Sequence, residues 1–281
     1  MKKITTKKFL NGHLAHYVVD GNGPWIVLIH PLATDLTVWA PHVRQLCRHY
    51  RVLRYDVRGH GKSSSHAPLN ASGYTLELLA GDLRALMDEL GIDSAHIAGI
   101  AMGGLIGHQL SLSNPGRLKS LTLAGSQLTE ARHTAHAAEN WSRWITLAEQ
   151  HGMDGPDGVA DEILASYFTA AFRSGHSGTM SRVSRLIRCT SPTGFVRACR
   201  AIRSMASVAP LKRGEPPTLL VTGEMDAAAL AAEKTFARLS GAKFVCLPDA
   251  GLCAALEQEE AFLACLEGFL ERISEPLALP D

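Results

Sequence analysis

The sequence predicts an α/β fold in which helices flank a mainly parallel central sheet and a helical cap is inserted between two strands. Two patterns predict it. Short apolar runs alternate with amphipathic stretches along most of the 281 residues, as parallel strands joined by helical crossovers do. The alternation stops between about residues 128 and 210, where the composition is helical. A chain of this length with 46% hydrophobic residues can also bury a substantial core.

The first elements are the easiest to assign. Residues 24–31 (PWIVLIHP) form an apolar run that ends at a proline, which indicates a buried parallel strand. We expect a helix over 39–50 and, over 51–65, a strand that leads into a Gly/Ser loop. Residues 75–91 form the clearest helix, because Gly91 ends it and its apolar side chains share one face. That face carries Leu76, Leu79, Leu83, Leu86, Met87 and Leu90.

The rest of the chain continues the alternation around the predicted cap. The predicted strands are 94–101, 118–127, 216–226 and 242–251, and the predicted helices are 103–114 and 259–273. The alternation assigns residues 1–127 and 211–281 to the α/β core and residues 128–210 to the cap.

Charge and cysteine usage restrict the class of partner. The formal net charge is +1, so we expect neither nucleic acid nor an anionic membrane as a partner. The first residues lack the apolar core and cleavage site of a secretion signal, and no stretch has 18 consecutive apolar residues. The six cysteines are scattered and form no C-x-x-C pair, which favours reduced thiols. We therefore expect a cytoplasmic protein with a small-molecule ligand, no metal and no cofactor; an oligomer is compatible with the sequence.

Residues 99–104 read GIAMGG and stand between a predicted strand and a predicted helix. This is the setting of the G-x-S-x-G nucleophile elbow, in which a serine occupies a sharp strand-to-helix turn. The central residue here is Ala101, which has no nucleophilic atom.

With these segments in place, the chain resembles the α/β-hydrolase superfamily, and within it the 3-oxoadipate enol-lactonase branch. The stretch LIHPLATDLTVWAPHVRQL resembles the oxyanion-loop region of that branch, and VLRYDVRGHGKSS resembles its arginine-glycine loop. The segment SAHIAGIAMGGLIGHQLSLSNPGRLKSLTLAGS resembles the elbow, its helix and the next strand. The resemblance covers most of the chain and implies an α/β-hydrolase fold with a site at the elbow.

The resemblance places the catalytic positions on Ala101, Asp226 and Leu252, in the chain order nucleophile, acid, histidine. Only the acid has a residue type that a triad uses. All thirteen histidines lie between His13 and His176, so none can follow Asp226 in that order. An engineered serine-to-alanine change would account for Ala101 alone and would leave the histidine in place. We therefore expect a degenerate triad and no conventional serine hydrolysis.

Backbone donors survive a change of side chain. The resemblance implies an oxyanion hole formed by the N–H groups of Met102 and Leu32, with the elbow residue Ala101 beside it. Such donors hold a carboxylate, an enolate or a carbonyl oxygen, helped by the N-terminus of the following helix. His30, at the start of the same loop, is either a base or a ring that bonds to neighbouring backbone and shapes the loop.

Other side chains allow two interpretations. Trp39, Trp141 and Trp144 are either aromatic walls over a ligand or plain core. Cys253, next to the Leu252 position, is either a thiol nucleophile or a small buried filler, and the filler is favoured because the sequence gives it no histidine partner.

Three functions are compatible with these residues. The first is a pseudo-enzyme that binds a small carboxylate or lactone-like ligand without hydrolysing it. The second is a non-hydrolytic enzyme, an isomerase, lyase, decarboxylase or cyclase, with Asp226 or His30 transferring a proton. The third is a remodelled ester or lactone hydrolase in which one of these groups activates water.

Overall fold

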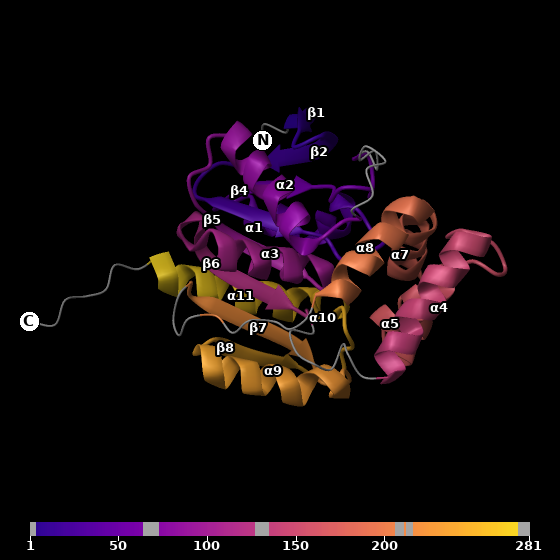
Figure 1. Ribbon diagram of the computed structural model, residues 1–281. Helices are drawn as coiled ribbons and strands as arrows, with labels where there is room; N and C mark the ends of the chain where they lie inside the picture. The colour runs from indigo at the N-terminus through magenta and orange to yellow at the C-terminus, as the bar shows by residue number, and fades with distance from the viewer. Residues whose placement is uncertain (1–3, 64–72, 127–134, 206–210, 212–215, 275–281) are drawn as a thin grey trace, which may run out of the picture.

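The computed structural model describes residues 4–63, 73–126, 135–205, 211 and 216–274. It contains one eight-stranded sheet in the order β1-β2-β4-β3-β5-β6-β7-β8. The strands are β1 (Ile4–Leu10), β2 (His13–Asp20), β3 (Trp25–Ile29), β4 (Arg51–Tyr55), β5 (Ala95–Ile100), β6 (Leu118–Ala124), β7 (Thr218–Gly223) and β8 (Lys243–Leu247). From β4 to β8 all neighbouring strands are parallel, so the predicted mainly parallel α/β fold is confirmed (Figure 1).

The central strands are buried on both faces. All six residues of β5 and all six of β7 are buried, because helices pack on both sides of a parallel sheet. The flanking helices outside the predicted cap are α1 (Ala40–Leu46), α2 (Leu76–Glu89), α3 (Met102–Ser113), α9 (Ala227–Ser240), α10 (Ala254–Glu257) and α11 (Glu259–Ser274). The two short 3-10 helices are η1 (Leu36–Trp39) and η2 (Pro115–Arg117).

Two features lie beyond the predicted order of elements. One is the antiparallel hairpin of β1 and β2, which turns at Asn11 and Gly12, both with positive φ (45° and 78°). The other is helix α9, whose first turn is capped by the Asp226 side chain and which ends at Gly241 with a φ of 72°. The predicted helix 39–50 is shorter than expected, since η1 precedes it and α1 ends at Leu46.

In the part of the chain that the structure describes, five helices follow β6 and precede β7, where the sequence predicts the cap. They are α4 (Ala135–His151), α5 (Ala160–Tyr167), α6 (Ala170–Gly175), α7 (Ser177–Arg188) and α8 (Pro192–Ser204). We call them the cap helices; in Figure 1 they lie together at one end of the sheet. The predicted boundaries near 128 and 210 fall outside the described residues. Among the described helices, none is both long and apolar enough to cross a bilayer.

Candidate functional site

The turn between β5 and α3 has the backbone geometry of a strained elbow. Ala101 has φ 48° and ψ −113°, a conformation that costs a non-glycine residue free energy and that surrounding structure must hold in place. Its N–H donates to the carbonyl oxygen of Ala124 at the end of β6 (2.9 Å). Its own carbonyl accepts from the N–H groups of Gly104 and Leu105 (3.0 and 3.2 Å). The chain is therefore fixed on both sides of residue 101.

The glycines of GIAMGG are required by close packing. A Cβ on Gly99 would collide with the backbone of Gly103, and a Cβ on Gly103 would collide with the carbonyl oxygen of Ile29. A Cβ on Gly104 would meet the hydroxyl of Ser126. The small residues let helix α3 begin directly against the ends of β3 and β5. The elbow geometry thus persists around a residue without a nucleophile.

The sequence predicted donors at the backbone N–H groups of Met102 and Leu32. Met102 is the first residue of α3, so its N–H has no intrahelical acceptor. Leu32 follows β3, and its carbonyl accepts from the hydroxyl of Tyr167 (2.6 Å). Within the described part of the chain, neither the Met102 nor the Leu32 N–H donates to another protein group.

The cap helices hold the loop that carries Leu32. Tyr167, at the end of α5, is fully buried and bonds to the Leu32 carbonyl. The hydroxyl of Thr190 donates to the carbonyl of Ala33 (2.9 Å), a residue with a φ of 58°. Both carbonyls of this strained turn are therefore engaged by the segment that joins β6 to β7. The position of the Leu32 N–H depends on these contacts.

His30 is completely buried, and both of its ring nitrogens have partners. The N–H of Val57 donates to Nε2 (2.9 Å), so Nδ1 carries the proton and donates to the carbonyl of Pro31 (2.8 Å). Burial lowers the pKa of His30 and favours this neutral form. Such a ring has no free lone pair for a ligand proton. The geometry supports the loop-shaping role of His30 over proton transfer.

The neighbouring arginine-glycine loop is held by Asp56. Its Oδ1 accepts from the N–H of Leu36 (2.8 Å), and its Oδ2 accepts from the N–H of Lys62 and contacts Nδ1 of His16 (2.7 Å each). These bonds lower the pKa of Asp56 against the effect of its burial. Arg58 is likewise engaged by both carboxylate oxygens of Asp82 (2.6 and 2.7 Å). These charged side chains support the loops around the elbow.

Asp226 and Leu252 line the same cavity. It has a volume of about 330 Å³ and is also lined by Ala165, Ser166, Phe168, Thr169, Ala170, Met225 and Gly251. Asp226 is half-buried and caps α9 by accepting from the N–H of Ala229 (3.2 Å). The acid and histidine positions predicted from the sequence are therefore brought together under the cap residues 165–170. The side chain at the second position is apolar.

The backbone around Leu252 also meets the end of β6. A Cβ on Gly125, which has a φ of 54°, would collide with the carbonyl oxygen of Leu252. Gly125 directly follows Ala124, the acceptor of the Ala101 N–H. The loops after β5, β6, β7 and β8 thus converge at one edge of the sheet, where ligand sites of open α/β sheets lie.

The sequence did not indicate Glu257, which braces this loop. Its carboxylate accepts from the N–H of Thr169 (2.7 Å) and from the N–H of Gly251 (3.3 Å). Burial raises the pKa of Glu257 although both hydrogen bonds oppose that shift. The residue connects the Leu252 loop to the cap helices. No motif marks it, because its role depends on a contact across 88 residues.

The remaining predicted residues occupy different settings. Trp39 is fully buried in the core, with its ring centre 5.0 Å from that of His42 and 6.1 Å from that of Phe262, which favours the core interpretation. Trp141 and Trp144 are half-buried on α4 and pack edge-to-face at 5.3 Å. Cys253 is fully buried, and burial raises the pKa of its thiol far above the usual value. That keeps the thiol protonated and supports the filler interpretation.

Comparisons with known proteins agree with this architecture. The model of the alpha/beta hydrolase fold family matches residues 24–251. The chain is 29% identical over 256 residues to 3-oxoadipate enol-lactonase 1 of Acinetobacter baylyi, covering 90% of both chains. Its sequence is 33% identical to that of the enol-lactonase from Burkholderia xenovorans, whose crystal structure matches with a TM-score of 0.81. The match covers 95% of this chain and 100% of the enol-lactonase chain. A hydrolase structure from Pseudomonas aeruginosa is 29% identical, with a TM-score of 0.82 and coverage of 95% and 98%.

Proposed function

The chain belongs to the α/β-hydrolase fold family and is similar to enol-lactonases of that family. We propose that it binds a small carboxylate or lactone at the elbow without serine hydrolysis. The Met102 and Leu32 N–H groups form the oxyanion site and receive the ligand's carboxylate or carbonyl oxygen. The N-terminus of α3 adds its positive potential to the same place.

One observation carries this proposal: the elbow geometry is retained around Ala101. The residue keeps φ 48° and ψ −113°, and the glycines beside it have no room for a Cβ. A strained turn of this kind costs free energy, and such turns cluster at functional sites, which supports a use for the donors that this one presents. A serine in the same turn would supply a nucleophile, whereas alanine supplies space and an apolar methyl group.

The absence of both reactive side chains determines which reactions the site can carry out. Residue 101 has no oxygen, Leu252 cannot accept a proton, and no histidine follows His176 in the sequence. Formation of an acyl-enzyme needs a nucleophile with an adjacent base. Binding at the donors requires neither, and oxyanion donors with substrate binding still retain about 10³–10⁴-fold catalysis over water after removal of a triad.

A second candidate function rests on Asp226. This carboxylate is half-buried at a cavity of about 330 Å³ whose other lining side chains carry no charge. A carboxylate there is placed to move a proton to or from a bound ligand whose oxyanion rests on the backbone donors. The corresponding activity is an isomerisation, elimination, decarboxylation or cyclisation. Both ring nitrogens of His30 are already hydrogen-bonded, so Asp226 is the better candidate for this proton transfer. In a remodelled hydrolase, Asp226 is also the group that would activate water.

Turnover and binding assays on matched variants separate the functions. Wild-type protein is incubated with enol-lactones and small esters, and both ligand binding and product formation are followed. Saturable binding without product supports the binding function; product that disappears in Asp226→Asn, a variant that keeps a helix-capping side chain, supports the second. Rapid turnover through a covalent adduct on the elbow peptide would overturn both.

The double substitution Ala101→Ser and Leu252→His tests whether the cavity retains hydrolase chemistry. Gain of turnover in the double variant, with none in either single variant, is expected if the pocket still positions a lactone or ester against residue 101. If neither turnover nor ligand binding is found in any variant, the proposed ligand class is wrong.

A further inference from the structure

Two of the segments that line the cavity of about 330 Å³ are joined by one carboxylate, that of Glu257. Residues 165–170 of the cap form one segment, and residues 251–252 after β8 form the other. Oε1 of Glu257 accepts from the N–H of Thr169 (2.7 Å). Oε2 accepts from the hydroxyl of Thr169 (3.2 Å) and from the N–H of Gly251 (3.3 Å). We call these three hydrogen bonds the Glu257 bridge.

The two segments also approach each other closely at the Glu257 bridge. A Cβ built on Gly251 would lie 3.4 Å from Oε1 of Glu257 and 3.5 Å from Cγ2 of Thr169. Glu257 itself is 9% exposed, so the bridge is buried between the cap and the loop after β8. The spacing of these two segments therefore depends on how the carboxylate holds its partners.

Thr169 passes this contact on to helix α6. Its hydroxyl accepts from the N–H of Phe172 (3.2 Å), and the preceding residue, Phe168, is buried and lines the cavity. The rings of Phe168 and Phe172 stack with their centres 5.5 Å apart, and the ring of His176 stacks on Phe172 at 4.0 Å. These contacts join the segment into one unit, so the bond from Glu257 to Thr169 also positions the Phe168 ring at the cavity.

We propose that Glu257 is a positioning residue whose ionised carboxylate holds the cap and the loop after β8 at the spacing that binds a ligand. Protonation replaces one acceptor site of the carboxylate by an O–H donor, while the N–H groups of Thr169 and Gly251 can only donate. The Glu257 bridge is then weaker, and ligand affinity falls. This effect on affinity rests on the function proposed above, whereas the bridge itself does not.

The surroundings of Glu257 determine where it takes up a proton. Burial raises its pKa above the ordinary value of 4.5, although its hydrogen bonds and the charge of His176 oppose that shift. The proton therefore binds at a pH closer to neutral than in an exposed glutamate. Burial also raises the pKa of the Tyr167 phenol and of the Cys253 thiol, so both stay protonated in this range. The other titratable or charged side chains on neighbouring elements are His176, Arg182, Asp226 and Glu259.

Amide NMR on the ligand-free protein tests the Glu257 bridge by itself. As the pH is lowered from neutral toward 4.5, the Thr169 and Gly251 amide signals are expected to move along one common titration curve, because both N–H groups bond to the same carboxylate. In Glu257→Gln, which has no proton to gain, this curve disappears.

Three variants exclude the neighbouring groups as the source of the curve. His176→Gln, Asp226→Asn and Glu259→Gln each remove a side chain whose charge can change in this range, and each should retain the curve. Glu259 is the matched control for Glu257, since burial raises its pKa as well and it lies two residues further along the chain.

A second titration with γ-butyrolactone, which has no titratable group, tests the effect on the ligand site. Its affinity for the wild-type protein is expected to fall along the same curve as the pH is lowered. At neutral pH, Glu257→Gln should bind it about three- to tenfold more weakly, the effect of losing one acceptor for a backbone N–H. The remaining affinity should not follow that curve.

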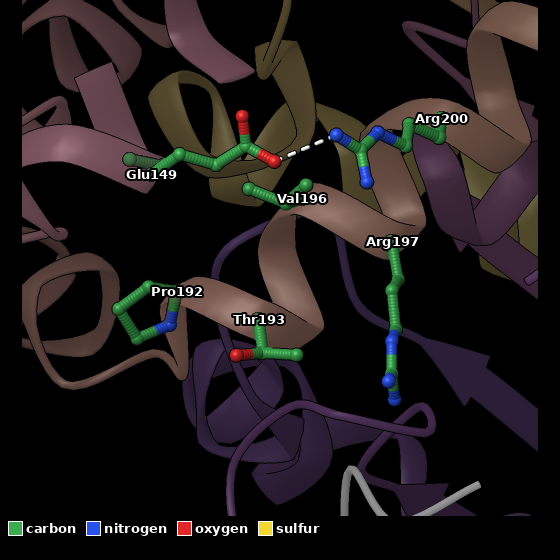
Figure 2. A pocket seen from close by; sticks show the side chains of 7 residues that line it. Glu149, Pro192, Thr193, Val196, Arg197 and Arg200 are labelled. Carbon is green, nitrogen blue, oxygen red and sulfur yellow. Dashed lines mark hydrogen bonds and ion pairs between the residues drawn. The ribbon is translucent and has the colours of Figure 1, made fainter. Parts of the chain in front are cut away.

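Another carboxylate of the cap provides a control for general loosening of the cap helices. Glu149 of α4 pairs with Arg200 of α8 (2.6 Å) beside a separate cavity of about 360 Å³ (Figure 2). Among the described residues, none lines both this cavity and the one at the Glu257 bridge. The two paired side chains are 47% and 57% exposed, and such surface pairs contribute little. Glu149→Gln should therefore leave the amide curve and the lactone affinity unchanged.

The inference is overturned if the Thr169 and Gly251 signals titrate separately or not at all, or if their common curve persists in Glu257→Gln. If that variant fails to fold, the wild-type curve and the three neighbouring variants decide, because loss of the curve in one of them assigns it to that group. A lactone affinity that ignores the curve would contradict the positioning role. A lactone that binds at no pH, with the curve present, would contradict the proposed function and leave the bridge supported.

Discussion

The hydroxyl of Tyr167 donates a 2.6 Å hydrogen bond to the carbonyl oxygen of Leu32, a residue 135 positions earlier in the chain. The backbone carbonyl of Tyr167 also accepts from the N–H of Cys253, next to Leu252 (3.0 Å). One residue of the cap helices thus contacts the loop with the proposed Leu32 donor and the loop after β8. The cap and the candidate site are coupled through it.

The first prediction follows from this coupling. Tyr167→Phe removes the donor and leaves the Leu32 carbonyl buried without that partner, so the free energy of unfolding falls by about 1–3 kcal/mol. Because the Leu32 loop loses a fixed contact, ligand affinity at the elbow falls as well. Urea unfolding and a binding titration measure the two effects. A variant with unchanged stability and unchanged affinity would show that this hydrogen bond does not position the loop.

A second prediction concerns the glycine that lets α3 start against β3. Gly103→Ala places a methyl group against the carbonyl oxygen of Ile29, and the backbone on both sides is fixed. Overpacking of this kind lowers the free energy of unfolding by about 1–3 kcal/mol or more. Gly116→Ala is the matched control, because nothing lies within 4 Å of its added Cβ, and its effect should stay within about 0.5 kcal/mol. Equal effects in the two variants would contradict the packing described for the elbow.

A third prediction concerns pH. Burial lowers the pKa of His42 from 6.5 to about 4, while the unfolded chain keeps the usual value. Between these two pH values the unfolded state binds more protons than the folded state, so the free energy of unfolding falls as the pH falls from 6.5 toward 4. The contribution of this residue is up to about 1.4 kcal/mol per pH unit.

The variant His42→Gln isolates that contribution. Glutamine retains a donor for the carbonyl of Ala255, which Nε2 of His42 contacts at 2.8 Å, but it has no proton to gain. The free energy of unfolding is measured with denaturant at several pH values between 4 and 6.5. Plotted against pH, it should rise less steeply for His42→Gln than for wild type. Identical slopes would mean that His42 is protonated to the same extent in both states.

The fold was largely predictable because its central strands are mostly apolar and mostly buried. The runs at 24–31, 94–101 and 118–127 contain β3, β5 and β6, and a strand buried on both faces leaves this continuous pattern. The β1–β2 hairpin is harder to recognise, since most of β1 is exposed and carries polar side chains. Helix α9 carries alanine-rich sequence whose buried side includes Glu233, so its apolar face is weak.

The site was predictable only where chain order determines it. Ala101, Asp226 and Leu252 follow strands β5, β7 and β8, and parallel strands bring their carboxyl ends to one edge of the sheet. No comparable rule predicts from the sequence which contacts the cap helices make. Glu257 and Tyr167 act through partners far away in the sequence, and the two nitrogen partners of His30 depend on the fold of neighbouring loops. These roles become visible only with the structure.

The most direct test of the central claim is an amide NMR titration of the wild-type protein with a saturated γ-lactone that carries a carboxylate. Binding at the elbow predicts that the Met102 and Leu32 amide signals shift along one common saturation curve while the lactone remains intact. The account would be contradicted if both signals stayed in place while the ligand bound elsewhere, or if the protein opened the lactone through a covalent intermediate.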